Sequence, residues 1–182
     1  MLKGKTILVG VCGGIAAYKI CSLVSALKQA GAIVDVVLTQ NAQKFVTPLT
    51  FQSLSGRPVH TDMFAAVEAG NWEIDHIALA KSADLIVIAP ATANVLGKLA
   101  NGLADDLLTT TVLAAKVPVL LVPAMNTGMW ENAIVRDNVK KLGKFGFRFL
   151  GPVKGNLACG DSGSGRMIDP EKILEAIQKA AG

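Results

Sequence analysis

The sequence predicts a single α/β domain, with a Rossmann-like parallel sheet covered by helices on both faces. Short apolar runs rich in β-branched residues alternate with longer amphipathic stretches, which is the pattern of repeated βαβ units. The run Leu85–Ala89 is apolar at every position, as expected for a strand buried on both faces of a parallel sheet. With 182 residues, of which 51% are hydrophobic and 18% charged, the chain can bury a sizeable core as one domain spanning 1–182.

Each expected strand is a short apolar run followed by turn-forming residues. These runs are Thr6–Val11, Ile33–Thr39, Leu85–Ala89, Val117–Val122 and Phe147–Leu150. Apolar residues at helical spacing predict helices over Ile15–Gln29, Thr47–Leu54, Glu73–Lys81, Ala93–Ala100, Asp105–Ala115, Asn132–Phe145 and Pro170–Ala181. The last helix has the strongest start signal, because Asp169 can cap it and Pro170 occupies its first position.

One segment fits neither pattern. Gly151–Met167 contains several glycines and no periodicity, although it lies between a strand and a helix. A loop of this length in a compact domain usually covers a site or is disordered. We expect a flexible flap over a ligand at about residues 151–168.

Composition and charge disfavour several classes of protein. The net charge is +4, but aromatic residues make up only 5% and most basic residues are scattered, so nucleic-acid binding is not expected. The densest basic run, from Arg136 to Lys154, is better explained as a solvated helix face and the strand after it. The longest uncharged stretch, Val117–Trp130, is shorter than the roughly 20 residues of a membrane span. No secretory signal is recognised at the N-terminus, so a cytoplasmic location is expected.

The cysteines argue against disulfide bonds and metal binding. Cys12, Cys21 and Cys159 form no C-x-x-C pair, so neither a disulfide framework nor a zinc site is expected. Cys12 and Cys21 lie in predicted core elements. Cys159 lies in the glycine-rich segment, where a chemical role is favoured over a structural one.

The segments that follow the strands are the candidates for a binding site, because ligands of parallel α/β sheets bind at the carboxyl ends of the strands. The first is a glycine turn with Gly13 and Gly14, whose backbone N–H groups and following helix suit a phosphate. A dinucleotide would require an acid at the end of the second strand, where Thr39 stands instead, so a mononucleotide phosphate is favoured. A tight turn without a ligand explains the glycines equally well.

The next two strand ends carry polar side chains that allow two interpretations. Thr92 and Asn94 begin a helix, where Thr92 fits a simple capping role and Asn94 fits it less well. Asn126 stands beside the apolar Met125 and Met129, which fits a turn with an apolar plug or a ligand bearing one carboxylate. Both readings stay open at this point.

His76 lies off the apolar stripe expected from Ile74, Ile77 and Ala78. It is therefore expected to be solvated or to face another subunit. The nearby Trp72 favours the contact surface, because an exposed Trp beside an exposed His is unusual for a monomer.

Together these segments resemble the flavin-dependent cysteine decarboxylases, among them the phosphopantothenoylcysteine decarboxylases of coenzyme A biosynthesis. The matching motifs extend over nearly the whole chain. They are Gly13–Lys19, Asp75-His76, Ala89–Asn94, Gly102–Thr110, Pro123–Trp130, and Ala158–Asp161 with Gly165–Met167. The Pro-Ala-Met-Asn-x-x-Met-Trp block and the Ala-Cys-Gly-Asp motif are specific, whereas the glycine turn alone is weak.

The resemblance implies a flavodoxin-like, FMN-binding domain. The FMN phosphate is expected at Gly13, Gly14, Thr39 and Thr92, and the ring near Asn94 and the loop after Ala104. Ile15, Asp105 and Thr109 are the other residues expected to bind the cofactor. The implied reaction converts 4′-phospho-N-pantothenoylcysteine to 4′-phosphopantetheine through thioaldehyde and enethiolate intermediates. In that reaction Asn126 holds the substrate carboxylate, His76 acts in acid/base or positioning work, and Cys159 donates the last proton. Met125, Met129 and Arg166 complete the expected substrate site, with the role of Arg166 open.

The resemblance also implies partners and leaves alternatives. A homotrimer, or trimers gathered into a dodecamer, is expected, with His76 reaching the flavin of a neighbouring subunit. In bacteria such a domain often precedes a phosphopantothenate–cysteine ligase, fused or separate. The alternatives are a decarboxylase of peptide C-terminal cysteine and a non-catalytic flavin carrier or electron-transfer module.

Overall fold

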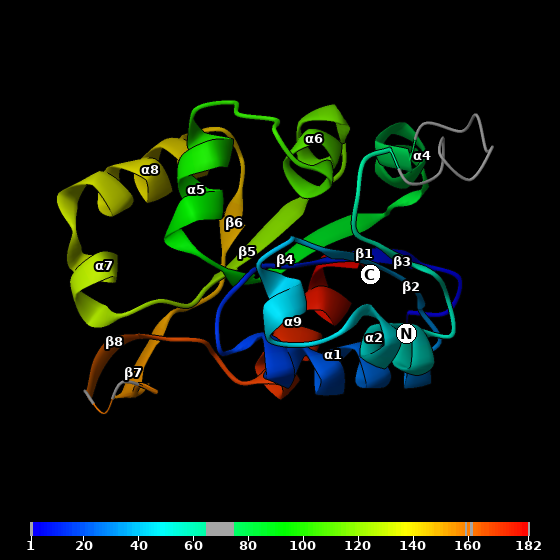
Figure 1. The fold of residues 1–182 in the computed structure, drawn as a ribbon, viewed down its shortest axis with the longest axis horizontal. Helices are drawn as coiled ribbons and strands as arrows, with labels where there is room; N and C mark the ends of the chain where they lie inside the picture. Colours follow the sequence, from blue (N-terminus) through cyan, green and yellow to red (C-terminus); the bar gives the residue numbers. More distant parts are fainter. Residues whose placement is uncertain (1, 65–74, 159, 161, 182) are drawn as a thin grey trace.

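A six-stranded parallel sheet forms the centre of the molecule in the computed structural model, which describes residues 2–64, 75–158, 160 and 162–181 (Figure 1). The strand order is β3-β2-β1-β4-β5-β6, and every pairing within this sheet is parallel. The strands are β1 (Thr6–Val11), β2 (Ile33–Leu38), β3 (Val59–His60), β4 (Leu85–Ala91), β5 (Val119–Pro123) and β6 (Arg148–Phe149). All their carboxyl ends therefore lie at one edge of the sheet.

Helices cover both faces of this sheet (Figure 1). One face carries α1 (Ala17–Gln29), α2 (Pro48–Ser55) and α9 (Pro170–Ala181). The other carries α4 (Asp75–Ser82), α5 (Ala93–Ala100), α6 (Leu107–Ala114) and α8 (Ala133–Lys144). The short helices η1 (Ala42–Lys44) and α7 (Thr127–Glu131) follow β2 and β5. The predicted α/β class, with a parallel sheet between two helical layers, is confirmed.

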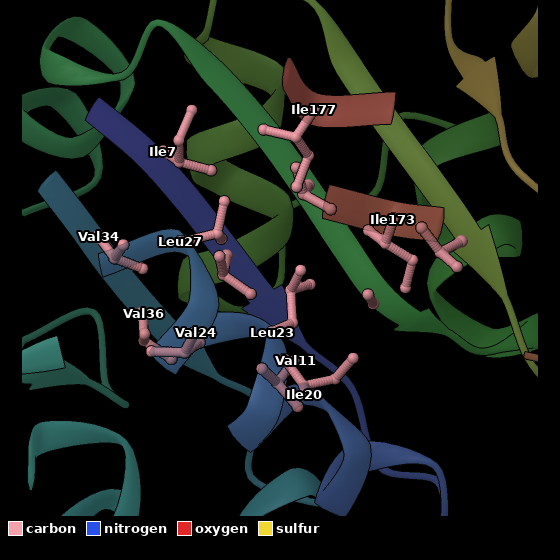
Figure 2. Packing of buried hydrophobic residues seen from close by; sticks show 14 of the residues in the cluster. Ile7, Val11, Ile20, Leu23, Val24, Leu27, Val34, Val36, Ile173 and Ile177 are labelled. Atoms are coloured by element: carbon pink, nitrogen blue, oxygen red, sulfur yellow. The ribbon is translucent and has the colours of Figure 1, made fainter. Parts of the chain in front are cut away.

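Alternate residues of the central strands supply two separate hydrophobic clusters. Ile7 and Val9 of β1 point toward α1 and α9, whereas Leu8 packs into the cluster on the opposite face. Figure 2 shows the first cluster, in which the helix residues Leu23 and Ile173 face the sheet. Each strand residue is thus removed from water whichever way it points, which explains why the predicted strands are apolar at nearly every position.

Most predicted elements agree with the structure, and the differences lie at their ends. Strand Thr6–Val11 and helices Ala93–Ala100 and Pro170–Ala181 have the predicted bounds. Helix α6 begins later than predicted, at Leu107, because Asp106 adopts an extended backbone and caps it. The two-residue β3 and the five-residue α7 were not predicted, since elements this short show no periodicity.

The glycine-rich segment is not the irregular loop that the sequence suggested. It forms an antiparallel hairpin of β7 (Val153–Asn156) and β8 (Ser162–Arg166), which lies outside the main sheet and beside α7 (Figure 1). A strand made largely of Gly and Ser has no apolar alternation, so only its backbone pairing reveals it.

The apolar stripe predicted for the helix around His76 is also corrected. Ile77 and Ala78 are only half-buried, whereas Leu79 and Ala80 are buried. Helix α4 packs against α6, and this contact decides which of its side chains are covered. The predicted Ile74 and Trp72 lie outside the described residues. Within the described part of the chain, no helix is long and apolar enough to cross a membrane.

Candidate functional site

A cavity of about 620 Å³ lies at the carboxyl ends of β1, β2, β4 and β5, and we call it the strand-end cavity. Most of the residues predicted for a cofactor line it, although they come from distant parts of the chain. Its lining residues are Cys12, Gly13, Gly14, Thr39, Gln40, Asn41, Thr92, Ala93, Asn94, Val95, Lys98, Asp105, Asp106, Ala124, Met125 and Met129.

Gly13 allows two loops of this cavity to approach each other closely. A Cβ atom at Gly13 would overlap the Asn41 side chain and lie 2.9 Å from the Asn41 carbonyl carbon, so no other residue fits without moving the backbone. A Cβ atom at Gly14 would instead make an ordinary contact, 3.8 Å from Thr92 Cγ2. The close packing of the two loops therefore requires glycine at position 13, whereas position 14 has room for a larger residue.

Two helix N-termini meet at the strand-end cavity. Gly14 precedes α1, and Ala93, Asn94 and Val95 begin α5. Neither helix has an acidic residue in its first turn. The positive ends of both helix dipoles therefore face this cavity with no acid in their own first turns, which favours an anion at these two helix starts.

Two threonine hydroxyl groups complete the polar wall. Thr92 Oγ1 accepts a hydrogen bond from Val95 N at 3.3 Å, and Thr39 Oγ1 accepts one from Ala42 N at 3.3 Å. Because each oxygen accepts from the backbone, each hydroxyl hydrogen stays available as a donor. Thr92 thus acts as the helix cap and also lines the cavity, so the two interpretations of this residue are compatible.

Two charged residues of this cavity, Lys98 and Asp106, were not predicted from the sequence. Lys98 Nζ lies 2.7 Å from Asp105 Oδ1 and 2.8 Å from Asp106 Oδ2, and it ties α5 to the start of α6. Burial raises the pKa of the Asp106 carboxyl, but hydrogen bonds from Lys98 and Thr109 outweigh this and leave the pKa below its usual value. Lys98 follows Asn94 by four residues, so it shares a helix face with it, and this spacing could have identified it.

Cys12 is a buried wall residue of the same cavity. Burial raises the pKa of its thiol to about 12. The group therefore stays protonated near neutral pH and does not act as a nucleophile. This environment agrees with its expected place in the core.

Two of the other predicted residues, Thr109 and His76, do not line the cavity. Thr109 is fully buried, and its Oγ1 donates to Asp106 Oδ1 at 2.8 Å, so it supports the cap of α6 and does not line the cavity. His76 is half-buried near the start of α4, and its buried Nδ1 has no hydrogen-bond partner among the residues that the structure describes. Cys159 lies outside the described residues.

A second hollow of about 500 Å³ adjoins the strand-end cavity, and we call it the hairpin groove. It shares Gly14, Ala124 and Met125 with the cavity, so the two spaces are neighbours. Its other lining residues are Ile15, Ala16, Tyr18, Lys19, Asn126, Asn156, Leu157, Ala158, Gly165, Arg166 and Met167. The predicted residues Ile15, Met125, Asn126 and Arg166 are thus brought together here, while Met129 lines the strand-end cavity.

Glycines fix the hairpin against the loop after β5. Met125 N donates to Gly165 O at 3.0 Å, and a Cβ atom at Gly165 would overlap the Met125 carbonyl oxygen. Gly165 also has φ +137°, a conformation that favours glycine. At Gly163, a Cβ atom would overlap Thr127 at the start of α7. One wall of the hairpin groove therefore depends on contacts that only glycine permits.

Asn126 has a fixed orientation at the junction of the two spaces. Its Oδ1 accepts a hydrogen bond from Gly128 N at 2.8 Å, and a backbone N–H can only donate. The amide nitrogen is therefore the opposite, donating end of the side chain. Such a donor suits a carboxylate. This agrees with the second interpretation of Asn126 from the sequence, a ligand that bears one carboxylate.

The donor set of the strand-end cavity fits a phosphorylated cofactor. Two helix N-termini, the hydroxyl groups of Thr39 and Thr92 and the amides of Asn41 and Asn94 surround it, and its volume exceeds that of one phosphate group. No group of three or more His, Cys, Asp or Glu side chains that could hold a metal ion occurs among the described residues.

The chain matches a known protein family and solved structures over nearly its whole length. The model of the family described as Flavoprotein matches residues 1–182. The chain is 51% identical over 179 residues to the coenzyme A biosynthesis bifunctional protein CoaBC of Bacillus subtilis (strain 168), covering 98% of this chain. It covers only 44% of that relative, so it spans less than half the length of the bifunctional protein.

Two solved structures are similar to the whole domain. A PPC decarboxylase mutant complexed with pantothenoylaminoethenethiol superposes with a TM-score of 0.87 at 32% identity, covering 96% of this chain and 97% of that one. The FMN-dependent cysteine decarboxylase SpaF gives a TM-score of 0.85 at 33% identity, with full coverage of both chains.

Proposed function

The chain belongs to the flavoprotein family, and we propose that it is an FMN-dependent decarboxylase of 4′-phospho-N-pantothenoylcysteine in coenzyme A biosynthesis. The observation that carries this proposal is the meeting of an anion-binding strand-end cavity with the hairpin groove at Met125. One space suits a phosphorylated cofactor and the other an elongated substrate. The similarity to CoaBC and to a PPC decarboxylase supports this substrate, and the FMN-dependent relative SpaF supports the cofactor.

FMN is proposed to lie with its phosphate at Gly13, Gly14, Thr39 and Thr92. Asn94 and Asp105 also line the strand-end cavity, and we propose that they lie beside the flavin ring. When bound there, FMN supplies the electron-pair acceptor and donor that a decarboxylation without net redox change requires. Thr109 supports this wall only through Asp106.

Asn126 is proposed to hold the substrate carboxylate. Its amide nitrogen is proposed to donate to that group. The adjacent Met125 lines both spaces, which supports a position of the substrate's reacting end beside the cofactor. Met125 and Met129 offer apolar contact near that end, so water is excluded where the carboxylate is to be lost as CO₂.

Two assignments rest on residues whose partners are not among those described. His76 is proposed for acid/base or positioning work in a homotrimer or dodecamer, and the lack of a described partner for its buried Nδ1 supports a contact from a neighbouring subunit. Cys159 is proposed to donate the final proton, on the basis of the sequence motif. We further propose a cytoplasmic setting and, given the 44% coverage, a ligase partner that is fused or separate.

The test begins with cofactor and substrate. The purified protein should take up FMN on titration and release CO₂ from 4′-phospho-N-pantothenoylcysteine with formation of 4′-phosphopantetheine. Asn126→Ala should keep FMN binding while it lowers turnover by roughly 10- to 100-fold, as expected for a lost hydrogen bond to a charged group. CO₂ release by Asn126→Ala at the parent rate would remove the assigned role.

The alternatives give different results in the same assay. A peptide decarboxylase would release CO₂ from a peptide with C-terminal cysteine and not from the small thiol substrate. A flavin carrier would bind FMN and release CO₂ from neither.

The proposed role of Cys159 is tested by substitution. Cys159→Ser should release CO₂ without forming 4′-phosphopantetheine. Cys12→Ser, which changes a buried residue of the cavity wall, should behave like the parent protein. Light scattering that shows a fully active monomer would contradict the proposed assembly.

A further inference from the structure

The described part of the hairpin groove has a positively charged lining. Among its described lining residues, Lys19 and Arg166 are the charged ones, and both are cations. They come from different elements, since Lys19 lies in the first turn of α1 and Arg166 ends β8. A groove whose described lining carries two cations and no acid favours an anionic group on its ligand.

One carboxylate orients both cations from outside the groove. Asp169 Oδ1 accepts a hydrogen bond from Arg166 Nη2 at 2.7 Å and lies 3.9 Å from Lys19 Nζ. Asp169 is not among the groove residues, and it immediately precedes α9. The cluster keeps one net positive charge, and Arg166 has further N–H groups for a second anion.

The dense basic run of the sequence does not supply this charge. Arg136 stacks over the Trp130 ring, 4.7 Å from its centroid, and Lys154 is exposed on β7; neither lines the groove. From the sequence, this basic run was expected to be a solvated helix face and the strand after it. The positions of Arg136 and Lys154 leave the pair formed by Lys19 and Arg166 to supply the charge of the described groove.

We propose that Arg166 and Lys19 bind the terminal phosphate of the substrate, and that Asp169 is a positioning residue that holds both cations toward the groove. This inference rests on the proposed function and extends it to substrate selection. Asn126 holds the carboxylate at the junction with the strand-end cavity, so the phosphate at the other end of the molecule requires a separate anchor. A planar guanidinium that is already oriented binds phosphate with little further loss of side-chain freedom.

The test compares two substrates on the FMN-loaded protein. Activity is measured with 4′-phospho-N-pantothenoylcysteine and with N-pantothenoylcysteine, which differ only in the phosphate. Arg166→Met should lower kcat/KM for the phosphorylated compound by roughly 10- to 100-fold and leave the other unchanged, because a charge-assisted hydrogen bond is lost. Methionine keeps an unbranched apolar stem to pack over Gly155, where Arg166 Cδ lies close. Lys19→Met should act in the same direction.

Matched controls and a binding measurement separate this inference from the proposed function. Lys154→Met removes one positive charge from the same hairpin, outside the groove, and should leave the substrate ratio unchanged. Calorimetry should show that Arg166→Met weakens binding of 4′-phosphopantetheine but not of pantetheine, and that Arg166→Lys restores part of the difference. Equal losses on both substrates would contradict the phosphate assignment alone. A wild-type protein that releases CO₂ from neither substrate would contradict the proposed function and this inference together.

Discussion

The strand-end cavity and the hairpin groove are built in different ways. Most of the cavity wall consists of residues that follow β1, β2, β4 and β5, which are buried on both faces, and Lys98, Asp105 and Asp106 complete it. The groove needs the start of α1, the loop after β5 and a hairpin outside the sheet to meet. A substitution that disturbs the cavity should therefore lower the stability of the whole domain. A substitution that disturbs the groove should affect the handling of substrate and leave the stability of the domain unchanged.

The largest expected effect comes from separating the hairpin from the loop after β5. Gly165→Ala places a Cβ atom against the Met125 carbonyl oxygen at a φ of +137°. A displacement of about 1 Å at Met125 and Asn126 should lower turnover by roughly 10²-fold. The dissociation constant for FMN should stay unchanged, as fluorescence titration can show. Gly143→Ala, which adds a methyl group in open space on α8, serves as the control.

Gly13→Ala should produce the opposite pattern. Its Cβ atom would meet the Asn41 backbone, so the domain should lose up to about 3 kcal/mol of unfolding free energy and bind FMN more weakly. Gly14→Ala is the matched variant, because its added Cβ atom would lie 3.8 Å from the nearest atom, Thr92 Cγ2. It should lower the unfolding free energy by less than about 1 kcal/mol. Urea denaturation of the apoprotein measures both. Equal stability of the two variants would show that the close approach to Asn41 is not required.

Asp106→Ala tests the polar wall of the strand-end cavity and should cost roughly 1–2 kcal/mol at pH 7, because it removes both a helix cap and a partner of Lys98. The folded-state pKa of Asp106 is lowered. Its contribution is therefore present above the unfolded-state pKa of about 3.9 and is lost as the pH falls through the folded-state value. The stability difference between wild type and variant should shrink below about pH 4. A constant difference down to pH 2 would contradict this.

Thr109→Val gives the smallest effect and decides between two roles for Thr109. If the hydroxyl serves only Asp106, the variant should lose about 1 kcal/mol or less of stability and keep its FMN affinity. A clear loss of FMN affinity with unchanged stability would instead support the direct contact between Thr109 and the cofactor that was predicted from the sequence. Thermal denaturation and FMN titration on the same preparation distinguish these results.

Sequence reasoning worked best where the signal is local. The apolar runs predicted the strands, and parallel strands place their carboxyl ends at one edge, so Gly13, Thr39, Thr92 and Asn94 could be grouped without coordinates. Two residues were harder to predict. Thr109 lies on α6, but its hydroxyl group donates to the capping residue Asp106 and does not line the cavity. Lys98 pairs with carboxylates of the loop that follows its own helix. Side-chain direction and charge pairing between elements leave no periodic trace.

The sequence by itself thus determined the α/β architecture and the edge at which a ligand binds, because hydrophobic periodicity and strand-end position are properties of short segments. Only the tertiary structure decided that the glycine-rich segment pairs with itself and attaches to Met125, and that Asp169 joins Arg166 to Lys19. These features depend on backbone hydrogen bonds and ion pairs between segments far apart in the chain. Their geometry exists only once the sheet and its helices have packed.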